Sequence, residues 1–145
     1  MEIKKAILTF KQLSPRRVTE FIILHHRAGD GTLLSIHQEH LNKGWAGCGY
    51  HFYVRKNGEV WAGRPINTIG AQCEGYNSKS IGVCFEGNFE LEKMNDVQFQ
   101  AGVWLMKYLR TNYYPRAKTK IGGHREFYAT ACPGKNFPLI KFKGM

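Results

Sequence analysis

The sequence of 145 residues fits one domain with a buried core. Its net charge of +10 comes from 21 lysines and arginines against 11 acidic residues. These cations are spread along the chain without a nucleic-acid-binding motif beside them, which argues against a nucleic-acid partner. No apolar stretch reaches the length of about 18 residues that a membrane span requires, so membrane insertion is not expected.

The N-terminal segment 1–5 begins with a basic character, but no apolar run or small-residue cleavage site follows it. We therefore expect no secretory signal peptide and synthesis in the cytoplasm. Cysteines are kept reduced in that compartment, and the spacing here is not that of a zinc ribbon. The four cysteines are Cys48, Cys73, Cys84 and Cys132.

Residues 21–25 are apolar on both faces, which predicts a strand covered on both sides. A polar, glycine-rich loop follows at His25-His26, and loops of this kind often carry function. The pattern Ser35 to Gln38 resembles a capping box and predicts a helix over residues 36–43, with Gly44 as its stop.

Two β-rich runs, 49–55 and 59–63, flank an Asn-Gly pair and predict a hairpin. Residues 80–87 predict another strand, Asn95 is a candidate cap of a helix that reaches about residue 112, and 118–122 predict a last strand. This mixture predicts a single α/β domain, residues 1–145, with a central mixed sheet flanked by helices.

Four residues at strand ends or in glycine- and proline-rich loops have side chains suited to a zinc ion. Two histidines and one cysteine would leave a fourth position open, as in a catalytic site. The residue types alone do not choose between His25 and His26, because neighbours on a strand point to opposite faces. The candidates are His25, His26, His124 and Cys132.

Five segments, in the same order along residues 21–134, resemble the type-2 N-acetylmuramoyl-L-alanine amidase family. This family includes amidase-type bacteriophage lysozymes and animal peptidoglycan recognition proteins. The segments are Phe21-Ile-Ile-Leu-His-His26, Gly44-Trp-Ala-Gly-Cys-Gly-Tyr-His-Phe52, Gly58-Glu-Val-Trp-Ala-Gly-Arg64, 75–89 with its Gly-Tyr-Asn-Ser start, and Gly123-His-Arg through Ala131-Cys-Pro-Gly134.

The resemblance implies one zinc ion per chain, held by His25, His124 and Cys132. It also implies that Tyr50 is an active-site residue, because a phenol near zinc can donate a hydrogen bond to a developing oxyanion. The alternative for Tyr50 is a core aromatic that shares a strand face with Phe52 and Val54, and His51 should point the other way as a structural residue.

The identity of the second catalytic group stays open. Thr130 stands where many phage members have lysine and where recognition proteins with amidase activity often have threonine. Glu86 is the second candidate, because some family members have a catalytic glutamate at the position matched by Cys84, and Cys84 and Glu86 should share one strand face. A carboxylate there could act as general base, and the alternative is a solvated acid at the strand end.

The implied reaction is zinc-assisted hydrolysis of the amide between N-acetylmuramic acid and L-alanine in bacterial peptidoglycan. From segment position, the substrate groove is expected at Trp45, Gln72 and Asn77, with His26 as a groove residue or a support of the metal site. The basic charge would favour adsorption to anionic wall polymers.

We expect a monomer without a separate wall-binding domain that acts on the cell wall, as a phage or prophage endolysin does; a cytoplasmic muropeptide-recycling enzyme is the alternative role. Two other functions compete with amidase activity: a non-catalytic peptidoglycan-binding module, and a zinc hydrolase of another bond in the stem peptide. The presence of Cys132 favours the enzyme, because non-catalytic recognition proteins commonly lack the ligand cysteine.

Overall fold

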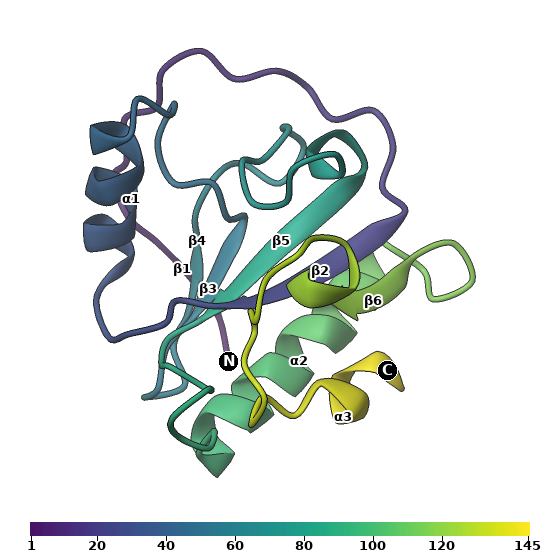
Figure 1. The fold of residues 1–145 in the computed structure, drawn as a ribbon. Helices are drawn as coiled ribbons and strands as arrows, with labels where there is room; N and C mark the ends of the chain where they lie inside the picture. Colours follow the sequence, from purple (N-terminus) through teal and green to yellow (C-terminus); the bar gives the residue numbers. More distant parts are fainter.

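The computed structural model describes all residues, 1–145, and contains one six-stranded mixed sheet with helices packed on it (Figure 1). The strand order is β1-β4-β3-β5-β2-β6. Strands β3 and β4 form the predicted antiparallel hairpin, and all other neighbouring strands are parallel. The strands are β1 (Ile3–Lys5), β2 (Phe21–His26), β3 (Phe52–Val54), β4 (Val60–Ala62), β5 (Ser80–Phe85) and β6 (Lys120–Gly123).

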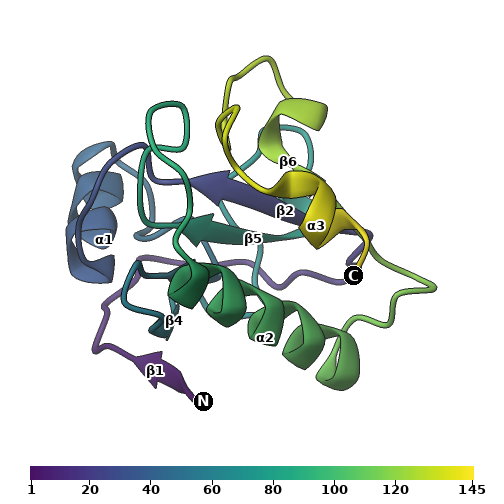
Figure 2. The same ribbon diagram turned by 90° about the horizontal axis from the view of Figure 1, so that it is seen from below.

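The helices lie in two layers, with α2 and α3 on one side of the sheet and α1 on the other (Figure 2). None of them combines the length and the apolar character needed to cross a membrane. The mixed sheet with helices on both faces confirms the fold class expected from the sequence. The helices are α1 (Leu33–Asn42), α2 (Asp96–Asn112) and α3 (Leu139–Lys143), with short 3-10 helices η1 (Asn77–Lys79) and η2 (His124–Glu126).

The main core fills the space between the sheet and the α2–α3 layer. Alternate residues Ile81, Val83 and Phe85 of β5 face this core, because successive side chains on a strand point to opposite faces. They meet Leu105 of α2 and Phe142 of α3, which are fully buried. Burial of each such side chain stabilises the fold by roughly 1.5–3 kcal/mol, so this side carries most of the apolar stabilisation.

A smaller core lies on the opposite face of the sheet. It joins Leu33 and Ile36 of α1 to Cys48, Tyr53 and Cys84. Only five buried residues make up this cluster, against 17 in the main core. A groove lies on this side of the molecule, lined in part by His40 and Lys43 at the end of α1.

One expectation from the sequence needs correction here, and one strand was not expected. Helix α1 begins at Leu33 rather than at residue 36, because the hydroxyl of Thr32 accepts a hydrogen bond from the N–H of Ser35 at 3.2 Å and caps the helix earlier. The short edge strand β1 was not predicted, since three residues with two lysines carry no clear alternation.

Strand alternation predicts that Tyr50 shares a face with Phe52 and Val54, but in the structure it does not. Phe52 and Val54 belong to the main core, whereas Tyr50 packs against the smaller cluster. Regular pairing starts at Phe52. Just before it, the carbonyls of His51 and Tyr50 still accept from the N–H groups of Gly63 and Arg64, next to β4, but Gly49 bonds to a different segment. The carbonyl of Gly49 accepts from the N–H of Ala71, and a Cβ on Gly49 would lie 2.0 Å from the Ala71 oxygen.

Candidate active site

The parallel strands β2 and β6 place two histidines side by side. Leu24 of β2 is paired with Gly123 of β6, so the next residues lie at the same level: His25, still within β2, and His124, just after β6. Their ring centroids are 4.5 Å apart. The site therefore lies at the carboxyl ends of the parallel strands, where open α/β sheets bind ligands.

Cys132 completes a cluster of three donor groups. The potential ligand atoms of His25, His124 and Cys132 all lie within 4.8 Å of one another. The Sγ atom of Cys132 is 3.7 Å from the Nδ1 atom of His25. Zinc bond lengths of about 2.3 Å to sulfur and about 2.0–2.1 Å to nitrogen give a tetrahedral S···N edge of about 3.6 Å, so this pair fits a zinc ion.

Burial keeps both imidazoles in the neutral form that a metal needs. It lowers the pKa of His25 to about 3, with a further contribution from the neighbouring His124, and it also lowers the pKa of His124. Burial raises the pKa of the Cys132 thiol to about 12, and the N–H of His26, which donates to this sulfur at 3.4 Å, acts in the opposite direction. Binding of a metal would release the thiol proton.

Tyr50 lies against this cluster. Its ring centroid is 5.1 Å from that of His25, and the side chain is partly buried. Burial raises the pKa of the phenol well above its ordinary value, and the neighbouring thiols of Cys84 and Cys132 add to the shift. The hydroxyl therefore keeps its proton at neutral pH and can donate a hydrogen bond.

Thr130 lies in the same loop as Cys132. Its Oγ1 accepts a hydrogen bond from the N–H of Cys132 at 3.3 Å, which leaves the hydroxyl hydrogen free to donate. The side chain is partly exposed beside the cluster. Its position is compatible with the expected role, and its chemistry is limited to hydrogen bonding.

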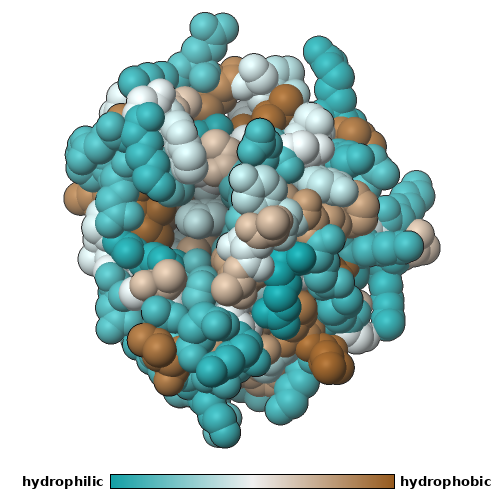
Figure 3. Space-filling view, viewed as in Figure 1, coloured by the Kyte–Doolittle hydropathy of each residue, from teal (hydrophilic) through white to brown (hydrophobic).

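A groove with a volume of about 430 Å³ opens beside the cluster. The space-filling view shows this face hollowed near its middle, between α1 and the loop after β6 (Figure 3). The groove contains Trp45, Gln72 and Asn77, the three residues expected there, and its charged lining residues are Lys43 and Glu74. The lining is His40, Lys43, Trp45, Tyr50, Ala71, Gln72, Cys73, Glu74, Asn77, His124 and Tyr128.

A second cavity, of about 470 Å³, lies away from the cluster between the N-terminal segment and β4. Its lining is mostly apolar and contains none of the three candidate ligands. The groove beside the ligand cluster is smaller than this cavity, but it is the one next to the candidate metal ligands.

The family model described as N-acetylmuramoyl-L-alanine amidase matches residues 14–135, which is most of the chain. The chain belongs to this amidase family. It is 33% identical over 130 residues to peptidoglycan-recognition protein SC2 of Drosophila melanogaster, with 80% of this chain and 68% of the relative covered. It is 32% identical over 131 residues to the endolysin of Klebsiella phage KP32, with 84% and 85% covered.

Comparison with solved structures agrees with the family assignment. The N-acetylmuramoyl-L-alanine amidase LysC from Clostridium intestinale superposes with a TM-score of 0.93 at 34% identity, covering 99% of this chain and 96% of LysC. The family expected from the five sequence segments is thus confirmed, and so is the single-sheet fold that carries the amidase site.

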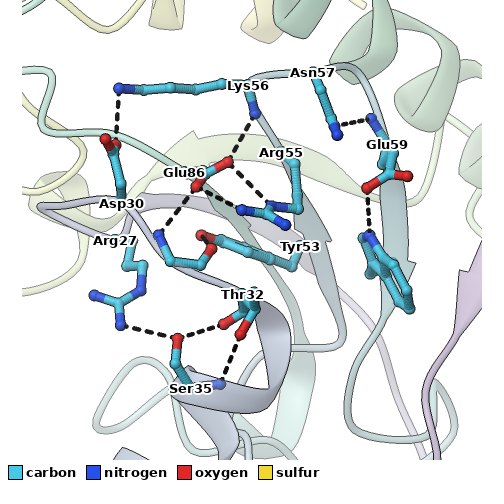
Figure 4. A network of polar contacts seen from close by, with 12 residues as sticks. Arg27, Asp30, Thr32, Ser35, Tyr53, Arg55, Lys56, Asn57, Glu59 and Glu86 are labelled. Carbon is cyan, nitrogen blue, oxygen red and sulfur yellow. Dashed lines mark hydrogen bonds and ion pairs between the residues drawn. The ribbon is translucent and has the colours of Figure 1, made fainter.

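The amidase does not bring Glu86 to the cluster, which corrects the expectation of a general base there. Its carboxylate accepts hydrogen bonds from both Nε and Nη2 of Arg55 and from the N–H groups of Gly31 and Lys56, at 3.0–3.1 Å (Figure 4). Glu86 does not line the groove. Cys84 and Glu86 share a face, but Glu86 lies beyond the strand end and is held by the hairpin and by the loop after β2.

His26 is also turned away from the groove in the amidase, contrary to the expected substrate contact. Its Nδ1 accepts a hydrogen bond from the N–H of Phe89 at 3.0 Å on the other side of β2. His26 contacts the site through its backbone: its N–H donates to Cys132 Sγ, and its carbonyl accepts from the same thiol. The alternation of side chains along β2 thus separates the two histidines that the residue types alone could not distinguish.

Three histidines outside the ligand set hold the site's framework. Nδ1 of His37 accepts from the N–H of Cys48 at 2.9 Å, and Nδ1 of His40 accepts from the N–H of Gly49 at 2.8 Å. Nδ1 of His51 accepts from the N–H of Gly82 at 3.0 Å, in line with its expected structural role. The sequence signal for the first two was their placement three residues apart on α1, which puts both on one helix face.

Proposed function

We propose that the chain hydrolyses the amide bond between N-acetylmuramic acid and L-alanine in bacterial peptidoglycan, using one zinc ion held by His25, His124 and Cys132. The observation that carries this proposal is the convergence of these three donors beside a groove that His124 lines. The family membership and the likeness to LysC support the same reaction.

Zinc in such a site supplies Lewis-acid polarisation of a carbonyl and an acidified water. The groove then has to hold the glycan and the stem peptide so that the scissile carbonyl reaches the cluster. Tyr50 is suited to donate a hydrogen bond to the oxygen of that carbonyl as negative charge develops on it. Trp45 offers an exposed ring for packing, with the ammonium of Lys43 4.9 Å from the ring centroid.

The second group near the reacting amide is, in this proposal, Thr130 rather than Glu86. The hydroxyl of Thr130 keeps its hydrogen available, whereas the oxygens of Glu86 are occupied by four donors. Asn77 is proposed as a substrate contact through Nδ2, because its Oδ1 is occupied by the N–H groups of Gln72 and Cys73.

The endolysins of phages KP32 and T3 are among the relatives, at 32% identity. We therefore propose that the amidase attacks the cell wall in the manner of an endolysin, with the net charge of +10 favouring adsorption to anionic wall polymers. All candidate ligands and groove residues come from one chain, which supports action as a monomer.

A peptidoglycan-binding module is the competing function, and the likeness to recognition protein SC2 keeps it as the alternative without placing it ahead of the amidase. Digestion of purified peptidoglycan, with and without a chelator, separates the possibilities by product mass. Release of intact stem peptides from lactyl-bearing glycan, abolished by the chelator and restored by zinc, is the expected result. Shortened stem peptides would indicate a peptidase, and binding without release would indicate a recognition module.

A further inference from the structure

Gln72 lines the groove, but its amide is turned inward and both of its polar atoms are occupied. The Oε1 atom is 2.5 Å from Nε2 of His25, and the Nε2 atom is 2.6 Å from Oγ of Ser80. The side chain is 8% exposed. A substrate contact, expected from the position of Gln72 in the sequence, would require one of these bonds to break.

The partners of Ser80 fix the direction of every bond in this chain of contacts. The Ser80 hydroxyl donates its one hydrogen to the carbonyl of Tyr76 at 2.7 Å, so its oxygen is left to accept from Nε2 of Gln72. The carbonyl oxygen of Gln72 then faces His25 and can only accept. His25 must therefore donate from Nε2.

This direction has a consequence for the metal-facing side of the ring. A neutral imidazole carries one N–H, so a proton on Nε2 leaves Nδ1 as a free lone pair. Nδ1 is the atom that lies 3.7 Å from Sγ of Cys132 in the cluster. The opposite tautomer would direct a hydrogen into the position where a metal must bind.

Neighbouring residues fix the position of the Gln72 backbone and side chain. Oδ1 of Asn77 accepts from the N–H of Gln72 at 2.8 Å and anchors the loop before η1. Gly82 on β5 supplies space, because a Cβ there would lie 2.5 Å from Cγ of Gln72. The amide is therefore held at its backbone, along its aliphatic part and at both polar ends.

We propose that Gln72 is a positioning residue that holds His25 in the tautomer with a proton on Nε2, so that Nδ1 is presented to zinc, and that Ser80 sets the orientation of the Gln72 amide. This inference rests on the proposed zinc site. Partners of this kind, which hold the non-ligating nitrogen of a metal-binding histidine, orient the ring and raise metal affinity.

The test uses the full chain in its zinc-free form and reads the His25 tautomer from long-range ¹H–¹⁵N NMR correlations. In the wild type we expect the pattern of an Nε2-protonated ring. In Gln72→Met, whose thioether is only a weak acceptor, both tautomers should appear, and zinc affinity measured by chelator competition should fall by about 10–100-fold. Gln72→Glu keeps an acceptor and should retain the wild-type tautomer and an affinity within about threefold of wild type.

Ser80→Ala is the second variant, and it leaves Gln72 in place. Without the Ser80 oxygen the amide can rotate and present its NH₂ group to His25, so a population protonated on Nδ1 should appear. An unchanged tautomer in both Gln72→Met and Ser80→Ala, with unchanged zinc affinity, would overturn the proposal.

If Gln72→Met does not fold, as judged by its ¹H–¹⁵N amide spectrum, Ser80→Ala decides the outcome by itself. Failure of the wild type to bind zinc would count against the proposed function, whereas the tautomer is measured without metal and tests the role of Gln72 separately.

Discussion

Arg55 donates two hydrogen bonds to the carboxylate of Glu86, from Nε at 3.1 Å and from Nη2 at 3.0 Å. The N–H groups of Gly31 and Lys56 occupy the remaining positions of the same carboxylate. Through this partly buried ion pair and the bond from Gly31, Glu86 connects the β3–β4 hairpin to the loop after β2 (Figure 4). Glu86 is thus a structural link between two segments that border the active site.

The first prediction follows for Glu86→Gln. We expect zinc content and turnover close to wild type, because the carboxylate does not reach the groove. The free energy of unfolding at neutral pH should fall by about 1–3 kcal/mol, since an amide cannot accept from all four donors and leaves a buried donor unpaired. Urea unfolding and peptidoglycan digestion of the same preparation measure both; a large loss of turnover with unchanged stability would restore the general-base assignment.

The second prediction concerns pH. Burial raises the pKa of Glu86, but hydrogen bonds from Arg55 and from the N–H groups of Gly31 and Lys56 outweigh it and hold the pKa below its ordinary 4.5. A carboxyl with a lower pKa in the folded state stabilises the fold above its unfolded pKa and loses this contribution as the pH falls through the folded pKa.

The difference in unfolding free energy between wild type and Glu86→Gln should therefore be constant near neutrality and shrink below pH 4.5. Urea titrations at a series of pH values measure this difference. A gap that stays the same down to the acid limit would show that the ionised carboxylate contributes nothing to stability.

The third prediction tests the metal ligands. Cys132→Ala should lose stoichiometric zinc and amidase activity together, because the thiolate is one of three protein ligands. Cys73→Ala is the matched control, since this buried thiol also lines the groove but is outside the ligand cluster. Metal analysis of the two purified variants is the measurement, and full zinc occupancy in Cys132→Ala would remove Cys132 from the site.

The fourth prediction concerns Tyr50→Phe, which keeps the aromatic ring and removes one hydroxyl. Loss of a single oxyanion donor typically lowers turnover by about 10²–10³, and we expect that fall with zinc content and thermal stability unchanged. Activity near the wild-type level would mean that Tyr50 serves only the small core that it packs against.

The fifth prediction compares two changes at Thr130. Thr130→Ala removes the hydroxyl and should lower turnover by at least about 10², whereas Thr130→Ser keeps it and should stay within about tenfold of wild type. Zinc content should be the same in both variants. Equal activity of the two would show that the loop acts without this hydroxyl.

Much of the fold and part of the site could be predicted from the sequence, because they depend on local patterns. The Asn-Gly hairpin and the strands predicted over residues 21–25 and 80–87 follow from turn chemistry and apolar runs, and the structure has these strands at Phe21–His26 and Ser80–Phe85. The segment at Tyr50 could not be predicted, because its path depends on contacts with Ala71 and Gly82, far along the chain.

The same limit applies to the site residues. The hypothesis for Glu86 rests on the family's glutamate at the position of Cys84 and on strand alternation, whereas its neighbours in the structure, Arg55 and Gly31, are distant in sequence. The choice of His25 over His26 came from the family resemblance rather than from the residue pattern. The role of Gln72 depends on Ser80 and Gly82, and no spacing in the sequence indicates that these three residues meet.

The unequal division of the two cores has a consequence for how this scaffold can change. The 17-residue core under α2 and α3 anchors the fold on the side away from the groove, and only five buried residues lie beneath α1. Substitutions in α1 and in the loops around the groove therefore leave the larger core, the main contributor to cooperative folding, unchanged. Selection can thereby reshape substrate preference on one face while the opposite face maintains the fold.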